Sequence, residues 1–108
     1  MQRVARTVRL RPDAVEEYDR LHAAVWPEVL AAIERAGIRN YSIFRAGCLL
    51  FSYFELADGI EVLEVTERLL DAPECRRWEE LVQSLQEPQD GAPGGAWWLP
   101  MKEVFHQA

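Results

Sequence analysis

Two kinds of hydrophobic periodicity alternate along the chain, and their order constrains the fold more than any other feature. Apolar side chains at every second position predict a β-strand, whereas spacings of three and four predict a helix. Strand-like segments lie at residues 3–10, 38–45, 48–56 and 97–105, and helical spacing covers the stretches between Pro12 and Gly37 and from 60 to 86. The predicted order is strand, helix, strand, strand, helix, strand.

The first strand and the first helical stretch carry local signals. Arg6 interrupts an otherwise alternating apolar pattern. Asp13, followed three residues later by Glu16, is close to a capping box, so a helix is expected to begin there. Pro27 lacks an amide hydrogen and predicts a kink, or a restart with the proline in the first turn. Gly37 is expected to end this helical stretch.

One face of this stretch is expected to turn toward the sheet. Its members recur at helical spacing: Val15, Tyr18, His22, Val25, Trp26, Val29 and Ile33. Because Tyr18, His22 and Trp26 stand four residues apart, we expect them to share that face.

The second half of the chain contains a second helical layer, a loop and a closing strand. The break at 71–73 interrupts the helical layer, and residues 87–96 are rich in proline and glycine, which predicts a mobile loop. Trp97 to Phe105 is expected to close the sheet, with Pro100 indicating an edge position. Trp97 and Trp98 would point to opposite faces, so at most one can line a given pocket, and both are expected to be dimer or core residues.

These elements predict one α+β domain spanning residues 1–108. Two helices would cover one face of a four-stranded antiparallel sheet in the ferredoxin-like βαββαβ arrangement. The other face is expected to be apolar, because it would carry Phe44, Phe51 and Tyr53. A second copy packing sheet to sheet is the simplest cover, so we expect a homodimer of the dimeric α+β barrel type.

Composition excludes several classes of function. The net charge of −6 opposes nucleic-acid binding, and the longest apolar runs are far shorter than a membrane span, so a cytoplasmic protein is expected. Cys48 and Cys75 lack C-x-x-C spacing and are expected to be ordinary buried thiols. No phosphate-binding loop or cluster of metal-ligand spacing occurs, and neither a cofactor nor a metal is expected.

His22 is the most informative candidate residue, because its ring would point inward. It is either a buried histidine bonded to a backbone or carboxylate oxygen, or a general acid or base in a pocket. Tyr18, Tyr41 and Trp78 would add aromatic rings with polar tips. Such groups suit a sugar, whose C–H faces stack on rings while its hydroxyls form hydrogen bonds. Core packing is the competing interpretation for each of these rings.

Several motifs together resemble the L-rhamnose mutarotase family over nearly the whole chain. They are Pro12-Asp13-Ala14, Glu16-Glu17-Tyr18, His22, Val25-Trp26-Pro27-Glu28, Asn40-Tyr41-Ser42-Ile43-Phe44, Leu49-Leu50-Phe51 with Glu55, Cys75-Arg76-Arg77-Trp78 and Glu103-Val104-Phe105. One position departs from the pattern: Glu79 stands where a second aromatic residue is expected.

The resemblance implies a dimeric ferredoxin-like fold and cofactor-free interconversion of the α and β anomers of L-rhamnose, or of a related 6-deoxyhexose such as L-fucose. It implies that His22 is the proton donor and that Tyr18, Tyr41 and Trp78 contact the sugar. Protonated His22 would donate to the ring oxygen while a base, supplied by Tyr18, Glu55 or water, takes the proton of the C1 hydroxyl. A cofactor-free monooxygenase or isomerase of the same topology and a non-catalytic ligand-binding module are the alternatives.

Overall fold

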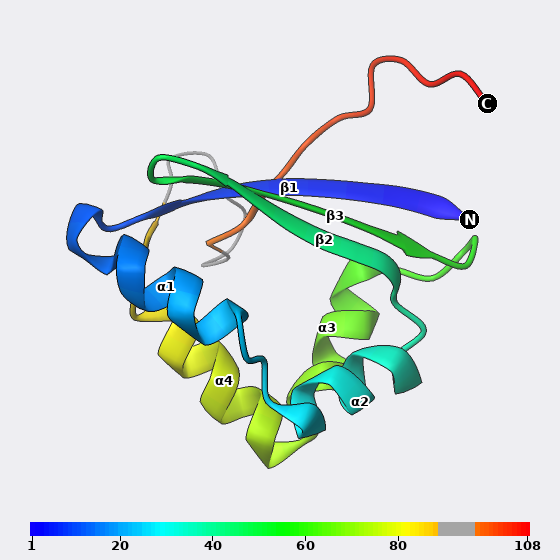
Figure 1. The fold of residues 1–108 in the computed structure, drawn as a ribbon. Coiled ribbons are helices and arrows are strands. Elements are labelled where there is room, and N and C mark those ends of the chain that lie inside the picture. Colours follow the sequence, from blue (N-terminus) through cyan, green and yellow to red (C-terminus); the bar gives the residue numbers. More distant parts are fainter. Residues whose placement is uncertain (89–96) are drawn as a thin grey trace.

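A curved antiparallel sheet forms one layer of the protein, and helices cover only one of its faces (Figure 1). The computed structural model describes residues 1–88 and 97–108. Its strands are β1 (Gln2–Leu10), β2 (Arg39–Ala46), β3 (Leu49–Leu56), β4 (Gln86–Glu87) and β5 (Leu99–Pro100). They follow the order β2-β3-β1-β4, and β5 also pairs with β1. The predicted α+β fold with helices on one face is confirmed.

Strand register separates a buried sheet face from an open one. Leu50, Ser52, Phe54 and Leu56 on β3 point toward the helices and are buried, whereas the residues between them point the other way. Arg6 of β1 stands opposite Ser52 and therefore also faces the helices. The residue that interrupts the apolar alternation is thus a charged group on the inner face of the sheet.

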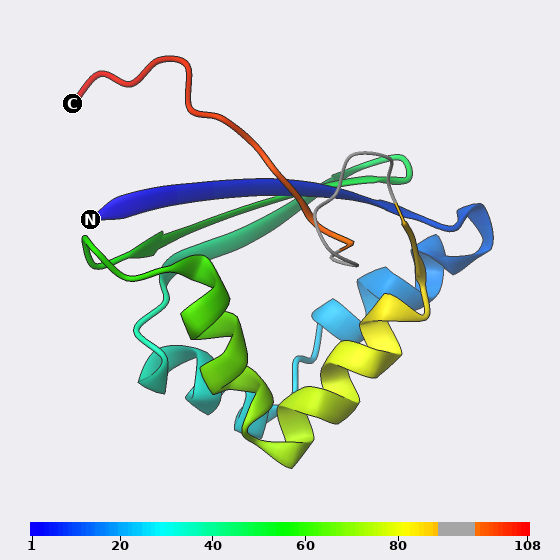
Figure 2. The ribbon, with the colours of Figure 1, turned by 180° about the vertical axis from the view of Figure 1, so that it is seen from behind.

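The open face carries apolar side chains, as the sequence predicts. Phe44 is 62% exposed and its ring lies 6.3 Å from that of Phe51, its partner in the β2–β3 register. Leu49 is exposed on the same face. The C-terminal segment, which includes the exposed Phe105, runs out beyond this side of the sheet, away from the helices (Figures 1 and 2).

The first helix does not begin with a capping box, and that prediction is wrong. Pro12–Ala14 form a 3₁₀ turn, and α1 (Val15–His22) follows with no side-chain hydrogen bond at its N-terminal end. The turn places Asp13 inside the 3₁₀ segment instead of at a capping position. Its carboxylate lies 3.6 Å from the Nε of Arg11.

The predicted restart at Pro27 is confirmed. Proline occupies the first turn of α2 (Pro27–Arg35), and the preceding Trp26 has an extended ψ of 134°. Gly37 ends this stretch with φ +85°, a conformation that glycine adopts without a steric penalty. Because α1 ends at His22, Trp26 does not share a helical face with that residue, and this part of the prediction is wrong.

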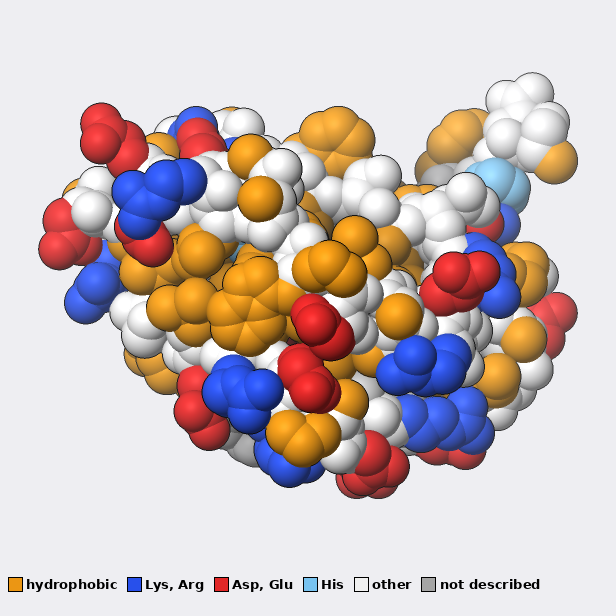
Figure 3. Space-filling view, turned by 60° about the horizontal axis from the view of Figure 1, so that its bottom comes forward, with side chains coloured by type: hydrophobic (Ala, Val, Ile, Leu, Met, Phe, Trp, Pro, Cys, Tyr) orange, Lys and Arg blue, Asp and Glu red, His pale blue; other side chains and the backbone are white. Residues whose placement is uncertain are grey.

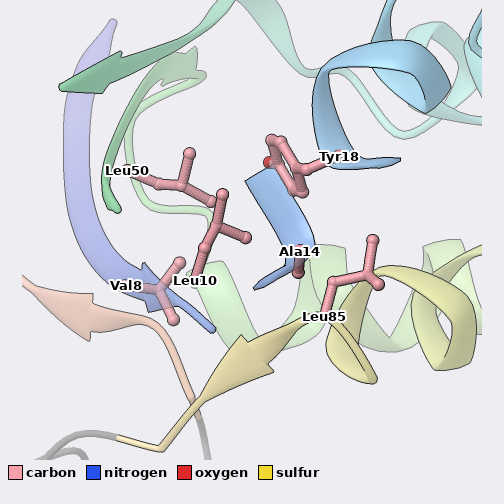
Figure 4. Packing of buried hydrophobic residues seen from close by; sticks show 6 residues of the cluster. All are labelled: Val8, Leu10, Ala14, Tyr18, Leu50 and Leu85. Atoms are coloured by element: carbon pink, nitrogen blue, oxygen red, sulfur yellow. The ribbon is translucent and has the colours of Figure 1, made fainter. Parts of the chain in front are cut away.

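The second helical layer consists of α3 (Val62–Leu70) and α4 (Pro73–Gln83), separated near residues 71–72 as predicted. Cys75, Trp78 and Val82 form the buried stripe of α4 and pack against Val29 and Ala32 of α2. A second cluster joins β1, β3, α1 and the end of α4. Its side chains point toward one another in Figure 4, and Tyr18 lies among them with 3% of its surface exposed.

The closing strand is much shorter than predicted. Only Leu99–Pro100 pairs with β1, and after one further bond, from the Met101 amide to the Ala5 carbonyl at 2.9 Å, the chain leaves the sheet. Proline has no amide hydrogen to extend the ladder. The sequence predicts a loop at 87–96, but its first residue, Glu87, belongs to β4 and pairs with Arg9 of β1. Residues 89–96 lie outside the described part of the chain.

Candidate active site

A cavity of about 350 Å³ lies between the helices and the inner face of the sheet. Its polar and aromatic lining consists of Tyr18, His22, Tyr41, Trp78, Glu79, Gln86 and Trp98, and its apolar lining of Val25, Val29, Leu30, Ile33, Ile43 and Val82. In the space-filling view from the helix side, hydrophobic side chains gather near the centre and left of the face, with charged side chains around them (Figure 3). The cavity has the size and mixed lining of a small-ligand site.

His22 stands at the last position of α1, and its ring is held from two sides. The ring stacks on Tyr18 with centroids 4.0 Å apart and meets the edge of Trp78 at 5.3 Å. Nδ1 lies 3.0 Å from the backbone carbonyl of Tyr18. A carbonyl oxygen only accepts hydrogen bonds, so Nδ1 carries a hydrogen and donates it. In the neutral ring, Nε2 therefore holds the lone pair and can accept a proton.

Burial lowers the pKa of His22 below its ordinary value of 6.5. The hydrogen bond to the Tyr18 carbonyl and the charge of Asp19 oppose this shift without cancelling it. The imidazole is therefore mostly neutral at pH 7. Once protonated, it is a stronger acid than an ordinary histidine and donates its proton more readily.

The other three predicted site residues line the same cavity as His22. Trp78 extends the aromatic wall to Trp26, with ring centroids 5.1 Å apart, and Tyr41 on β2 packs edge-on against Phe54 at 5.3 Å. Burial raises the pKa of both Tyr18 and Tyr41. Both phenols are therefore neutral at pH 7 and able to donate hydrogen bonds.

Glu55, which the sequence offers as a candidate base, lies on the wrong face of the sheet. It accepts hydrogen bonds from the Tyr53 hydroxyl at 2.7 Å and from the Asn40 amide at 2.5 Å. These two bonds, in that order, are the main reasons that its pKa is lowered. A carboxylate at this position cannot reach a ligand in the cavity beside His22.

Two further lining residues have no place in the predicted site. Trp98 borders the cavity, whereas the sequence predicts a dimer or core residue at this position. Glu79 follows Trp78 on α4, and burial raises its pKa, while the nearby Arg6 guanidinium opposes the shift. Glu79 is exposed to solvent, but the concave site places enough protein atoms around its carboxylate to raise the pKa. Its only signal in the sequence is its departure from the family pattern.

Neither metal binding nor membrane insertion has support in the described part of the chain. Residues 1–88 and 97–108 hold no group of three or more His, Cys, Asp or Glu side chains placed to bind a metal ion. None of the described helices has the length and apolar character that crossing a membrane demands.

The half-barrel sheet, its single helical layer and a pocket with a titratable ring define a small α+β enzyme of the dimeric α+β barrel class. Residues 3–107 match the family model described as L-rhamnose mutarotase. The chain is 32% identical to the L-rhamnose mutarotase of Lactiplantibacillus plantarum over 98% of both chains. It therefore belongs to the L-rhamnose mutarotase family, and it is an enzyme that acts on carbohydrates by interconverting sugar anomers.

Two further similarities frame the specificity and the fold. An L-fucose mutarotase of Xanthomonas campestris pv. campestris is 30% identical, with 97% of this chain and 87% of that protein covered. The crystal structure of an L-rhamnose mutarotase from Formosa agariphila superposes with a TM-score of 0.75 over the whole of both chains at 20% identity. The first relative is named for L-fucose instead of L-rhamnose, and the second has the same fold as this chain.

Proposed function

We propose that this protein interconverts the α and β anomers of L-rhamnose, or of a related 6-deoxyhexose such as L-fucose. The observation that carries the proposal is that His22, Tyr18, Tyr41 and Trp78 border one cavity. A proton-transfer group, two hydroxyl donors and aromatic faces are what binding and opening a sugar ring require. The names of the two relatives with about 30% identity support the choice of these sugars.

The reaction that we propose transfers only protons. Protonated His22 donates to the ring oxygen O5 while a base removes the hydrogen of the C1 hydroxyl, so the C1–O5 bond breaks and C1 becomes an aldehyde. Rotation about C1–C2 exposes the other face of the carbonyl group, and the reverse transfers close the ring as the other anomer. This chemistry requires no redox group and no metal ion. A positioned acid or base contributes roughly 10²- to 10⁴-fold to such a rate.

Tyr18, Tyr41 and Trp78 are proposed to bind the sugar. The indole face of Trp78 suits the C–H surface of a pyranose, and the two neutral phenols can donate to its hydroxyls. Val25, Val29 and Ile33 supply an apolar section of the lining that can accept the methyl group of a 6-deoxyhexose.

We further propose that the protein works as a homodimer in the cytoplasm. Phe44 and Leu49 leave apolar surface on the uncovered face of the sheet, and Phe105 is exposed on the segment that runs out beyond that face. Burying this surface between two copies would stabilise the pair. Free Cys48 and Cys75 fit a reducing compartment.

Saturation-transfer NMR on the anomeric protons tests the proposal with a panel of L-rhamnose, L-fucose, D-glucose and D-galactose. The expected result is exchange well above the buffer rate for at least one 6-deoxyhexose. Saturable binding with exchange at the buffer rate would favour a non-catalytic binding module. Oxygen uptake with a phenolic or quinonoid substrate and no effect on exchange would favour a cofactor-free monooxygenase.

A further inference from the structure

One carboxylate lines the same cavity as the proposed acid–base histidine. Glu79 is the only aspartate or glutamate among the described residues that line this cavity. It directly follows Trp78 on α4, and the ring centroids of Trp78 and His22 lie 5.3 Å apart. Asp19 lines a second pocket, which His22 also borders, but both oxygens of its carboxylate accept hydrogen bonds from Arg45, at 2.6 Å and 2.8 Å.

Glu79 lies near the two tyrosines of the cavity lining, because its charge acts on both of their hydroxyl groups. Its charge contributes to the raised pKa of Tyr18, which stacks on His22, and to that of Tyr41 on the facing strand. The charged or titratable groups around it are therefore Arg6 from β1, Tyr18 from α1, Tyr41 from β2 and Cys75 one turn earlier on α4, and His22 lines the same cavity. Among the described residues, no lysine or arginine is part of the cavity lining, and no ion pair of Glu79 with Arg6 is formed, so the carboxylate can exchange a proton with a bound sugar.

Ring opening needs an acid and a base at the same moment, and His22 can supply only one of the two. Tyr18 and Tyr41 are poor bases because their phenols hold their protons more tightly than ordinary tyrosines. Glu55 lies on the other face of the sheet. Among the described residues, Glu79 is left as the side chain that can complete the pair.

We propose that Glu79 is the second proton-transfer residue of this enzyme and shares a single proton with His22 across the bound sugar. The inference rests on the proposed mutarotase function. In the opening step, the C1 hydroxyl gives its proton to the Glu79 carboxylate, the C1–O5 bond breaks, and O5 takes the proton of the His22 imidazolium. In the closing step, the O5 hydroxyl returns its proton to His22 while O5 attacks C1. The new C1 oxygen then takes the proton of Glu79.

The pair therefore ends each cycle with the proton where it started, and the solvent supplies none. A pair holding one proton is active, whereas a pair with two protons lacks a base and a pair with none lacks an acid. Burial raises the pKa of Glu79 and lowers that of His22, so the affinities of the two groups for a proton move toward each other. The rate should fall on both sides of a plateau whose limits belong to the coupled pair.

Anomer exchange of L-rhamnose, measured by saturation transfer between pH 4.5 and 9 for wild type, Glu79→Gln and Glu80→Gln, tests the inference. Glutamine keeps the size of the side chain and removes its proton chemistry. Glu80 is the neighbouring exposed carboxylate outside the cavity lining, and it serves as the matched control. We expect Glu79→Gln to lower the maximal rate by about 10²-fold and to change the pH profile, with Glu80→Gln unchanged.

A further variant separates chemistry from space filling. Glu79→Trp installs the aromatic side chain that the family pattern favours at this position, and it should also lose activity if the carboxylate moves protons. Wild-type exchange rates and an unaltered pH profile in Glu79→Gln would overturn the inference while leaving the proposed function intact. Absence of exchange by the wild-type protein with every sugar would instead refute the proposed function. Circular dichroism and urea unfolding of each variant identify any loss that is due to misfolding.

Discussion

Trp78 contacts His22 and also packs in the core between α2 and α4. Its truncation should therefore lower the stability of the fold as well as alter the site. The side chain is 8% exposed and packs with Val29, Ala32, Cys75 and Val82 between α2 and α4. Its ring also meets Trp26 at 5.1 Å and His22 at 5.3 Å. Truncating a buried tryptophan to alanine costs about 3–5 kcal/mol, because apolar burial is lost and a cavity remains. We expect the Trp78→Ala variant to fall in this range.

Urea unfolding at one fixed protein concentration measures the change. With a slope of about 2 kcal/mol per molar urea, the midpoint should fall by roughly 1.5–2.5 M. Leu63→Ala on α3 is the control, because that side chain is 70% exposed and its loss should change stability by no more than about 0.5 kcal/mol. A loss below about 1 kcal/mol in Trp78→Ala would refute the view that this ring is a packed wall between His22 and the core.

The remaining predictions concern other parts of the fold. Ser52→Ala should raise the free energy of unfolding by about 1 kcal/mol in urea titrations, because the buried Oγ of Ser52 has no hydrogen-bond partner in the described structure. Gly37→Ala should lower it by about 1 kcal/mol, because alanine is strained at φ +85° even though open space surrounds the position. Phe44→Asp should shift sedimentation toward the monomer, and an unchanged dimer would exclude this face as the interface. Because folding raises the pKa of Glu79 above its ordinary 4.5, this residue favours the folded state below that pH, and the contribution is lost as pH rises through the folded value. Glu79→Gln should therefore gain stability relative to wild type between pH 4 and pH 8, and an unchanged difference would contradict a raised pKa of Glu79 in the folded protein.

Local signals in the sequence predict much of the fold. The missing amide hydrogen of Pro27 predicts where α2 begins, and the conformational freedom of Gly37 predicts where it ends. The sequence predicts the strand at 48–56 together with an apolar open face that carries Phe51, and this residue does lie on the face away from the helices. These features depend on covalent geometry and on the burial of apolar surface, both of which act over a few residues.

The composition of the site is less predictable, because long-range packing decides it. Trp26 lies in the break between α1 and α2, so its spacing of four residues from His22 does not put the two on one helical face. Both rings nevertheless contact Trp78. Glu79 and Trp78 are neighbours on α4, yet both border the cavity because the site is concave. The length of β5 depends on where the C-terminal segment stops pairing with β1. Pro100 indicates an edge position but not where that pairing ends.

The two histidines separate a role in catalysis from a general effect of removing an imidazole. His22 lines the cavity, whereas His106 lies in the exposed C-terminal segment, 4.0 Å from Glu103. Anomeric exchange of L-rhamnose should be accelerated equally by the wild-type protein and by His106→Ala. In His22→Ala it should fall by about 10²- to 10⁴-fold, with the fold retained. Undiminished exchange in His22→Ala would remove His22 from the mechanism and contradict the account.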